Sequence, residues 1–129
     1  MKPVHWIGSS KDDLSSFPDD VKKEAGFALY VAQKGDKSVN ALPMLGFGNA
    51  KVLEVVMNDD GNTYRAVYTV KFAKAVYVLH AFQKKSKRGN ETPKPDMNLI
   101  NRRLKAAEKH YVKQYESAVN REKKHERAS

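Results

Sequence analysis

The sequence has 129 residues, enough for one domain with a single hydrophobic core. Hydrophobic residues make up 40% and charged residues 30%, so the chain is too apolar to be disordered. It contains no cysteine and no apolar run of the roughly 18 residues that a membrane span requires. Disulfides and cysteine nucleophiles are therefore excluded, and we expect a cytoplasmic protein without a signal peptide.

The net charge of +9 is unevenly distributed along the chain. Residues 1–60 hold seven Lys or Arg against nine Asp or Glu, a balance of −2, whereas residues 61–129 hold seventeen against six, a balance of +11. An excess of positive charge in one half of the chain attracts polyanions, so we expect the second half to bind RNA. The alternative is that the charge only keeps a helix surface solvated.

The N-terminal part predicts one strand followed by two helices. Residues 4–7 are apolar and β-prone, which favours a short strand. Serines and acidic residues over 9–14 suit a short helix. A second helix is predicted from Pro18 to about Lys34, because small apolar residues recur at helical spacing and a glycine follows. Residues 42–49 break any regular pattern and predict a loop.

Three strands are predicted next, over residues 51–57, 63–72 and 75–84. Their connections are too short for a parallel crossover, so they should form an antiparallel meander. Side chains alternate between two faces along the second of these strands, and one of the faces is largely apolar. We expect helices to cover the apolar face and to leave the other partly open.

A long helix is predicted from Thr92-Pro93, a pair that suits a cap and a first turn. Its apolar positions step by three or four residues. They are Met97, Ile100, Leu104, Ala107, Tyr111, Tyr115 and Ala118. Residues 120–127 have no apolar side chain, so a basic tail over 120–129 should fray. The expected fold is α+β: an N-terminal strand and two helices, a three-stranded antiparallel meander and a long C-terminal helix, in one domain over residues 1–129.

The polar face of the meander gathers residues that could act on a phosphodiester. Alternation places Arg65, His80 and Lys84 there, with Phe82 as a surface for a base to stack on. Cations can stabilise charge on a phosphoryl transition state, and a histidine can transfer a proton near neutral pH. The alternative is that these side chains only face water, with the histidine a hydrogen-bonded structural residue. The four histidines show no spacing that suggests zinc, so no metal site is expected.

Three short motifs occur in a fixed order between residues 50 and 112. They are Thr63-Tyr64-Arg65-Ala66-Val67-Tyr68, then Val78-Leu79-His80-Ala81-Phe82-Gln83-Lys84-Lys85, then Thr92-Pro93 before the basic helix. In order and spacing they resemble the phage-derived HigB branch of the RelE-type toxins. The resemblance covers about half of the chain, and the N-terminal half carries no motif that matches.

The resemblance implies the toxin of a type II toxin–antitoxin pair. Such a toxin is a ribosome-dependent endoribonuclease that cuts messenger RNA in the ribosomal A site, without a metal or other cofactor. Attack by the ribose 2′-hydroxyl leaves a cyclic phosphate, and a helix-turn-helix antitoxin silences the activity. By position, Arg65 would hold the scissile phosphate, and Lys84 would be a second catalytic basic residue assisted by Lys85.

The sequence departs from that pattern on the strand before the Tyr64-Arg65 motif. Many members have basic residues there, whereas this chain has Glu54 and Val56. Glu54 could be a general base, or it could only be the salt-bridge partner of Arg65. The proton-transfer roles of Glu54 and His80 therefore stay open.

Further residues are expected to grip the RNA backbone or a base. They are Lys71, Phe82, Lys85, Lys87, Arg88, Arg102 and Lys105.

A second hypothesis assigns the chain to a different class: a non-catalytic basic module of phage or mobile-element origin that binds RNA or a partner protein. It predicts salt-sensitive binding without cleavage. A less favoured third hypothesis has the basic helix serve only to dock an antitoxin.

Overall fold

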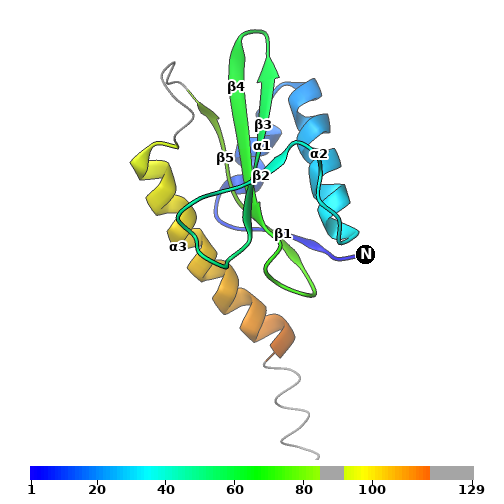
Figure 1. The fold of residues 1–129 in the computed structure, drawn as a ribbon, viewed down its shortest axis with the longest axis vertical. Helices are drawn as coiled ribbons and strands as arrows, with labels where there is room; N and C mark the ends of the chain where they lie inside the picture. Colours follow the sequence, from blue (N-terminus) through cyan, green and yellow to red (C-terminus); the bar gives the residue numbers. More distant parts are fainter. Residues whose placement is uncertain (85–91, 117–129) are drawn as a thin grey trace, which may run out of the picture.

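The computed structural model describes residues 1–84 and 92–116. Its elements are β1 (Val4–Trp6), α1 (Ser10–Ser15), α2 (Asp19–Gln33), β2 (Ala41–Pro43), β3 (Val52–Asp59), β4 (Asn62–Thr69), β5 (Val76–Lys84), α3 (Lys94–Tyr111) and a short π-helical turn, η1 (Val112–Glu116). The predicted RNA-binding residues Lys85, Lys87 and Arg88 and the predicted fraying tail at 120–129 lie outside the described residues. The α+β class is confirmed (Figure 1).

The sheet is larger than the predicted three-stranded meander. It has five strands in the order β1-β5-β4-β3-β2, and the meander β3-β4-β5 forms its centre. β1 pairs parallel to β5, with Val4 opposite Val76. β2 pairs antiparallel to β3, although it lies mostly inside the segment predicted as a loop. A three-residue strand is too short to show alternation, and its pairing is decided by β3 rather than by its own sequence.

The β3–β4 connection is tighter than predicted. The strands run on until Asp59 pairs with Asn62, which leaves a two-residue turn of Asp60 and Gly61. Both turn residues have positive φ, at 48° and 79°. This is the type I′ geometry that matches the twist of an antiparallel hairpin and favours Asp-Gly. The turn therefore sets the register that brings Glu54 near Arg65.

A β-bulge on β5 changes which residues share a face. The β4–β5 register pairs Val67 with His80 and Tyr68 with Val78, so Leu79 is the extra residue. Leu79 and His80 consequently both lie on the side of α3, whereas strict alternation would put neighbouring residues on opposite faces. Arg103 of α3 donates a hydrogen bond of 3.0 Å to the Leu79 carbonyl oxygen and so satisfies the acceptor at the bulge.

Helices cover both faces of the sheet, so the expectation of a partly open second face is wrong. In Figure 1, α2 runs along one side of the sheet and α3 along the other. Leu14 of α1 and the apolar stripe of α2 pack on the first face in one core cluster. A second cluster joins the other face to α3 through Ile100, Leu104, Ala107 and Tyr111. The predicted stripe of the long helix is thus confirmed from Ile100 to Tyr115, while Ala118 lies outside the described residues, and the stripe packs on the face on which the site was predicted.

Candidate functional site

Arg65 and Glu54 form an ion pair inside the protein. The Arg65 Nη1 atom lies 2.8 Å from Glu54 Oε1, and the residues are only 4% and 8% exposed. The β3–β4 register places the two on one face of neighbouring strands, displaced by two residues along the strand, since Arg65 stands opposite Val56. The structure therefore shows the salt bridge that was one of the two interpretations of Glu54.

Thr92 extends this ion pair to the start of α3. Its hydroxyl oxygen donates to Glu54 Oε2 over 3.2 Å. Thr92 was predicted to cap the helix, but the N-cap position is Pro93, and no side chain caps it. The Thr92 hydroxyl therefore binds a strand residue rather than the helix backbone. Glu54 thus accepts hydrogen bonds on both of its carboxylate oxygens.

His80 belongs to a second polar contact on the same face. Its Nε2 atom lies 2.7 Å from Asp96 Oδ1, in the first turn of α3. The ring of Phe82 stacks on the imidazole, with centroids 4.6 Å apart and planes at 17°. His80 is 6% exposed, and its Nδ1 atom has no hydrogen-bond partner within the described part of the chain. Asp96 was not singled out from the sequence, because a carboxylate in a first turn is common on dipole grounds alone.

The predicted catalytic residues are gathered on one face, but they are buried. Glu54, Arg65, His80 and Lys84 come from three adjacent strands, and Lys84, at 9%, is as covered as the others. Buried ionisable groups are rare unless paired, and clusters of them often mark functional sites. Solvent has little access to the cluster in this conformation, where Glu54 pairs with Arg65 and both Glu54 and His80 contact the start of α3.

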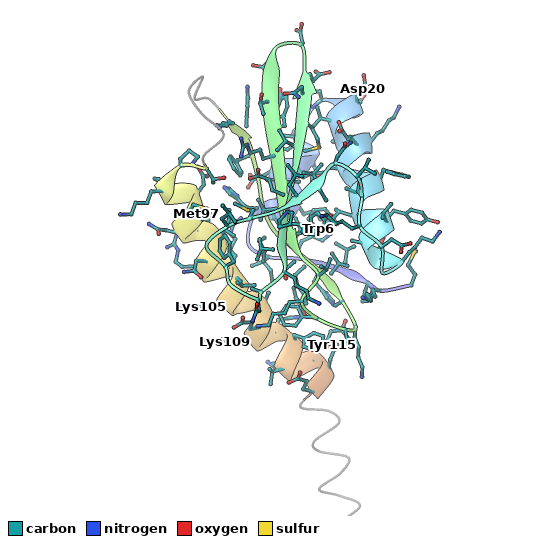
Figure 2. The ribbon with its side chains drawn as sticks, viewed as in Figure 1. Trp6, Asp20, Met97, Lys105, Lys109 and Tyr115 are labelled. Atoms are coloured by element: carbon teal, nitrogen blue, oxygen red, sulfur yellow. The ribbon has the colours of Figure 1, made fainter. Side chains whose placement is uncertain are left out.

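The predicted RNA-binding residues have three different environments. Lys71 is bound by Glu108 at 2.8 Å and stands 5.7 Å from the ring centroid of Phe72. Phe82 is half-buried against His80. Arg102 and Lys105 are exposed on the outer side of α3, and Figure 2 shows Lys105 and Lys109 along that helix. Among the predicted residues that the structure describes, Arg102 and Lys105 are exposed cations on α3, and Lys71 is exposed but pairs with Glu108.

A polar aromatic cluster at the other end of α3 was not predicted. His5 Nε2 lies 2.7 Å from the Tyr115 hydroxyl, and His110 Nδ1 lies 2.6 Å from the Tyr77 hydroxyl. The two imidazole centroids are 4.8 Å apart. Burial, and then the neighbouring His110, lower the pKa of His5 from its ordinary value of 6.5. Burial raises the pKa of Tyr77 to about 12, with smaller contributions from the neighbouring tyrosines. The cluster ties β1 to the end of α3.

One cavity lies away from all of these residues. Its volume is about 690 Å³, and it is bounded by the end of α2, the β2–β3 connection and the N-terminal residues. Lysines at positions 2, 37 and 51 stand around a floor that includes Ala32 and Leu53. It contains none of the predicted site residues. Within residues 1–84 and 92–116, no three His, Asp or Glu side chains are grouped to hold a metal ion.

Fold and site together define an α+β protein with helices on both faces of a mixed sheet and a buried, ion-paired basic cluster between sheet and helix. The family described as phage-derived protein Gp49-like (DUF891) matches residues 12–105, which is more than half of the chain. The chain belongs to this family, whose members are generally toxins of toxin–antitoxin systems. Membership implies an antitoxin partner. Comparisons with curated proteins and with solved structures found no match.

The family match includes all of the residues brought together at the buried cluster. Its span, 12–105, contains the three strands of the meander and the first turns of α3. It leaves out β1 and the end of α3, which carry the polar aromatic cluster. No helix within the described ranges is long and apolar enough to cross a lipid bilayer.

Proposed function

We propose that this protein is a ribosome-dependent endoribonuclease of the HigB-like, RelE-type toxins, which cuts messenger RNA in the ribosomal A site. The observation that carries the proposal is the assembly of Arg65, His80 and Lys84 on one face of the sheet, at the positions where the motifs resemble those toxins. Membership of a phage-derived toxin family supports the same interpretation. The proposed place of action is the cytoplasm, and the proposed silencing partner is a helix-turn-helix antitoxin.

The proposed chemistry is transesterification at the scissile phosphate. The ribose 2′-oxygen forms a bond to phosphorus while the bond from phosphorus to the 5′-oxygen breaks, leaving a 2′,3′-cyclic phosphate and a 5′-hydroxyl. Arg65 and Lys84 stabilise the negative charge that builds on the phosphoryl oxygens. One group takes the proton of the 2′-hydroxyl, and another returns a proton to the leaving oxygen. No metal or other cofactor is needed for these steps.

The burial of the cluster sets a condition on this mechanism. Thr92 and Asp96 hold the start of α3 against Glu54 and His80. RNA can reach the Arg65 guanidinium only after the contacts of Glu54 with Arg65 and Thr92 have been replaced by contacts with substrate. A phosphate would then take the place of the Glu54 carboxylate on the guanidinium, since both are oxyanions that arginine binds with two parallel hydrogen bonds.

The test is cleavage of messenger RNA on purified ribosomes, read by primer extension. Lys84→Met removes one cation, and the double variant Glu54→Gln, Arg65→Met removes a whole ion pair without leaving a buried charge. Lys23→Met, at an exposed position of α2, is the control. We expect cleavage by the parent and the control and a loss of at least about 100-fold in the other two. Cleavage at the parental rate by both would contradict the proposal.

A second candidate function is favoured by the same burial. If the cluster serves only to hold α3 on the sheet, the protein would act as a non-catalytic basic module through the exposed residues of α3, among them Arg102 and Lys105. This hypothesis predicts salt-dependent RNA binding with no cleavage, and equal losses of affinity when either residue is neutralised. The ribosome assay separates the two candidates, because only the first predicts new RNA ends.

A further inference from the structure

Asp96 and His80 form a carboxylate–imidazole pair that the sequence motifs do not contain. The contact of 2.7 Å joins His80 on β5 to the first turn of α3. Both partners are held in place: the bulge at Leu79 and its hydrogen bond to Arg103 set the backbone next to His80, and Phe82 stacks on the ring. Asp96 lies in the first turn of α3, at the positive end of the helix dipole, where a carboxylate is a common hydrogen-bond acceptor.

The hydrogen bonds determine which ring nitrogen carries the proton. An ionised Asp96 can only accept, so His80 Nε2 must be the donor. A second proton on Nδ1 would be a buried N–H without an acceptor among the described residues, which is unfavourable. The tautomer with hydrogen on Nε2 and a lone pair on Nδ1 is therefore the one that these contacts favour.

The lone pair on Nδ1 is otherwise unexplained. Buried polar atoms are almost always hydrogen-bonded, and those that are not call for a functional or structural reason. Here the same atom has the property that a general base needs, since it can accept a proton and has no competing donor nearby in the described chain. Glu54 lacks that property, because Arg65 and Thr92 already bind its two oxygens.

We propose that Asp96 is a positioning residue that fixes the tautomer of His80, so that Nδ1 is the atom that takes the proton from the ribose 2′-hydroxyl. The proton moves from the 2′-oxygen to Nδ1 as the bond from that oxygen to phosphorus forms and the bond to the 5′-oxygen breaks. The carboxylate of Asp96 then stabilises the resulting imidazolium. The role in cleavage rests on the proposed function, whereas the tautomer does not.

The tautomer is measured first, by ¹⁵N NMR of the full-length protein labelled at histidine. We expect the His80 signals of a neutral ring protonated at Nε2 and bare at Nδ1. In Asp96→Asn the amide can donate to Nε2, so the signals should shift toward the opposite tautomer. Asp96→Glu keeps a carboxylate and should keep the parental pattern. Glu108→Gln removes a carboxylate from the same helix, where it pairs with Lys71, and should change nothing at His80.

Cleavage on ribosomes is measured second, across a range of pH. Asp96→Asn should lower the rate by about 100-fold or more and remove the limb of the pH profile that reports the base. Asp96→Glu should recover part of the rate. An unchanged tautomer in Asp96→Asn, or a parental rate and pH profile despite an inverted tautomer, would overturn the inference. A parent protein that cuts no RNA would instead overturn the proposed function, since the tautomer is read without any activity.

Discussion

The guanidinium of Arg65 lies 2.8 Å from the carboxylate of Glu54 at a depth where the arginine is only 4% exposed. The two opposite charges therefore stabilise each other. Removing either side chain alone would leave the remaining charge buried and without this ion-pair partner. This relationship governs how the candidate site can be probed. An alanine substitution of Arg65 tests folding as well as chemistry.

We predict that Arg65→Ala lowers the free energy of unfolding by about 3–5 kcal/mol, the usual cost of removing one partner of a buried ion pair. Urea denaturation followed by circular dichroism measures it. The double variant Glu54→Gln, Arg65→Met should lose clearly less, because it removes both charges of the pair together. A single variant as stable as the parent would show that Glu54 is solvated or differently paired in solution.

The docking of α3 depends on apolar side chains that are wholly buried. Ile100 is 0% exposed and belongs to the cluster that joins α3 to the sheet. We predict that Ile100→Ala costs about 2–5 kcal/mol, the range for deleting a large aliphatic side chain from a core. Lys105→Ala, further along on the exposed side, should change stability by no more than about 0.5 kcal/mol. Equal losses in the two variants would mean that α3 does not pack on the sheet through this face.

Stability should fall in mildly acidic solution because of His5. Its pKa in the folded protein is lower than its ordinary value of 6.5, through burial and the nearby His110. The unfolded chain therefore binds the proton more readily, and the free energy of unfolding decreases as the pH falls from about 6.5 through the lowered value. Thermal unfolding between pH 8 and pH 5 tests this. In His5→Gln the stability should depend less on pH. If it depends on pH as steeply as in the parent, the effect comes from other titrating groups.

RNA binding by the exposed surface of α3 should follow counterion release. Neutralising Arg102 or Lys105 with glutamine is expected to weaken binding to unrelated RNA sequences by similar factors. The slope of log affinity against log salt should become shallower by about one for each phosphate that the variant no longer neutralises. Fluorescence anisotropy over a salt series measures both. Lys11→Gln, exposed on α1, is the control, and an equal effect of that variant would indicate binding by net charge alone.

Local patterns in the sequence predicted the elements well and the sheet only in part. The stripe from Ile100 to Tyr111 predicted the long helix and its buried face, because a helix repeats its contacts every three to four residues. The Asp60-Gly61 turn marks the β3–β4 hairpin, since few other residues tolerate two positive φ angles in succession. β2 was missed because its pairing with β3 depends on a partner strand rather than on its own pattern.

The residues of the candidate site were found, but their environment was not. Alternation correctly brought Arg65, His80 and Lys84 to one face, yet it could not show that α3 lies over that face. Alternation also could not show the bulge at Leu79, because an extra residue in one strand has no recognisable signature in the amino-acid sequence. The contact between His80 and Asp96 joins two elements whose relative placement is a tertiary property, so no spacing rule could have predicted it.

The parallel pairing of β1 with β5 also determines when this protein can fold during its synthesis. Val4 cannot pair until Val76 has been synthesised. The Tyr115 hydroxyl, which contacts His5, comes only near the end of the described chain. Closing so long a loop is entropically costly until later contacts offset it. A ribosome making this protein thus releases most of the chain before the sheet can close. The complete five-stranded sheet should therefore form only late in the synthesis of the protein.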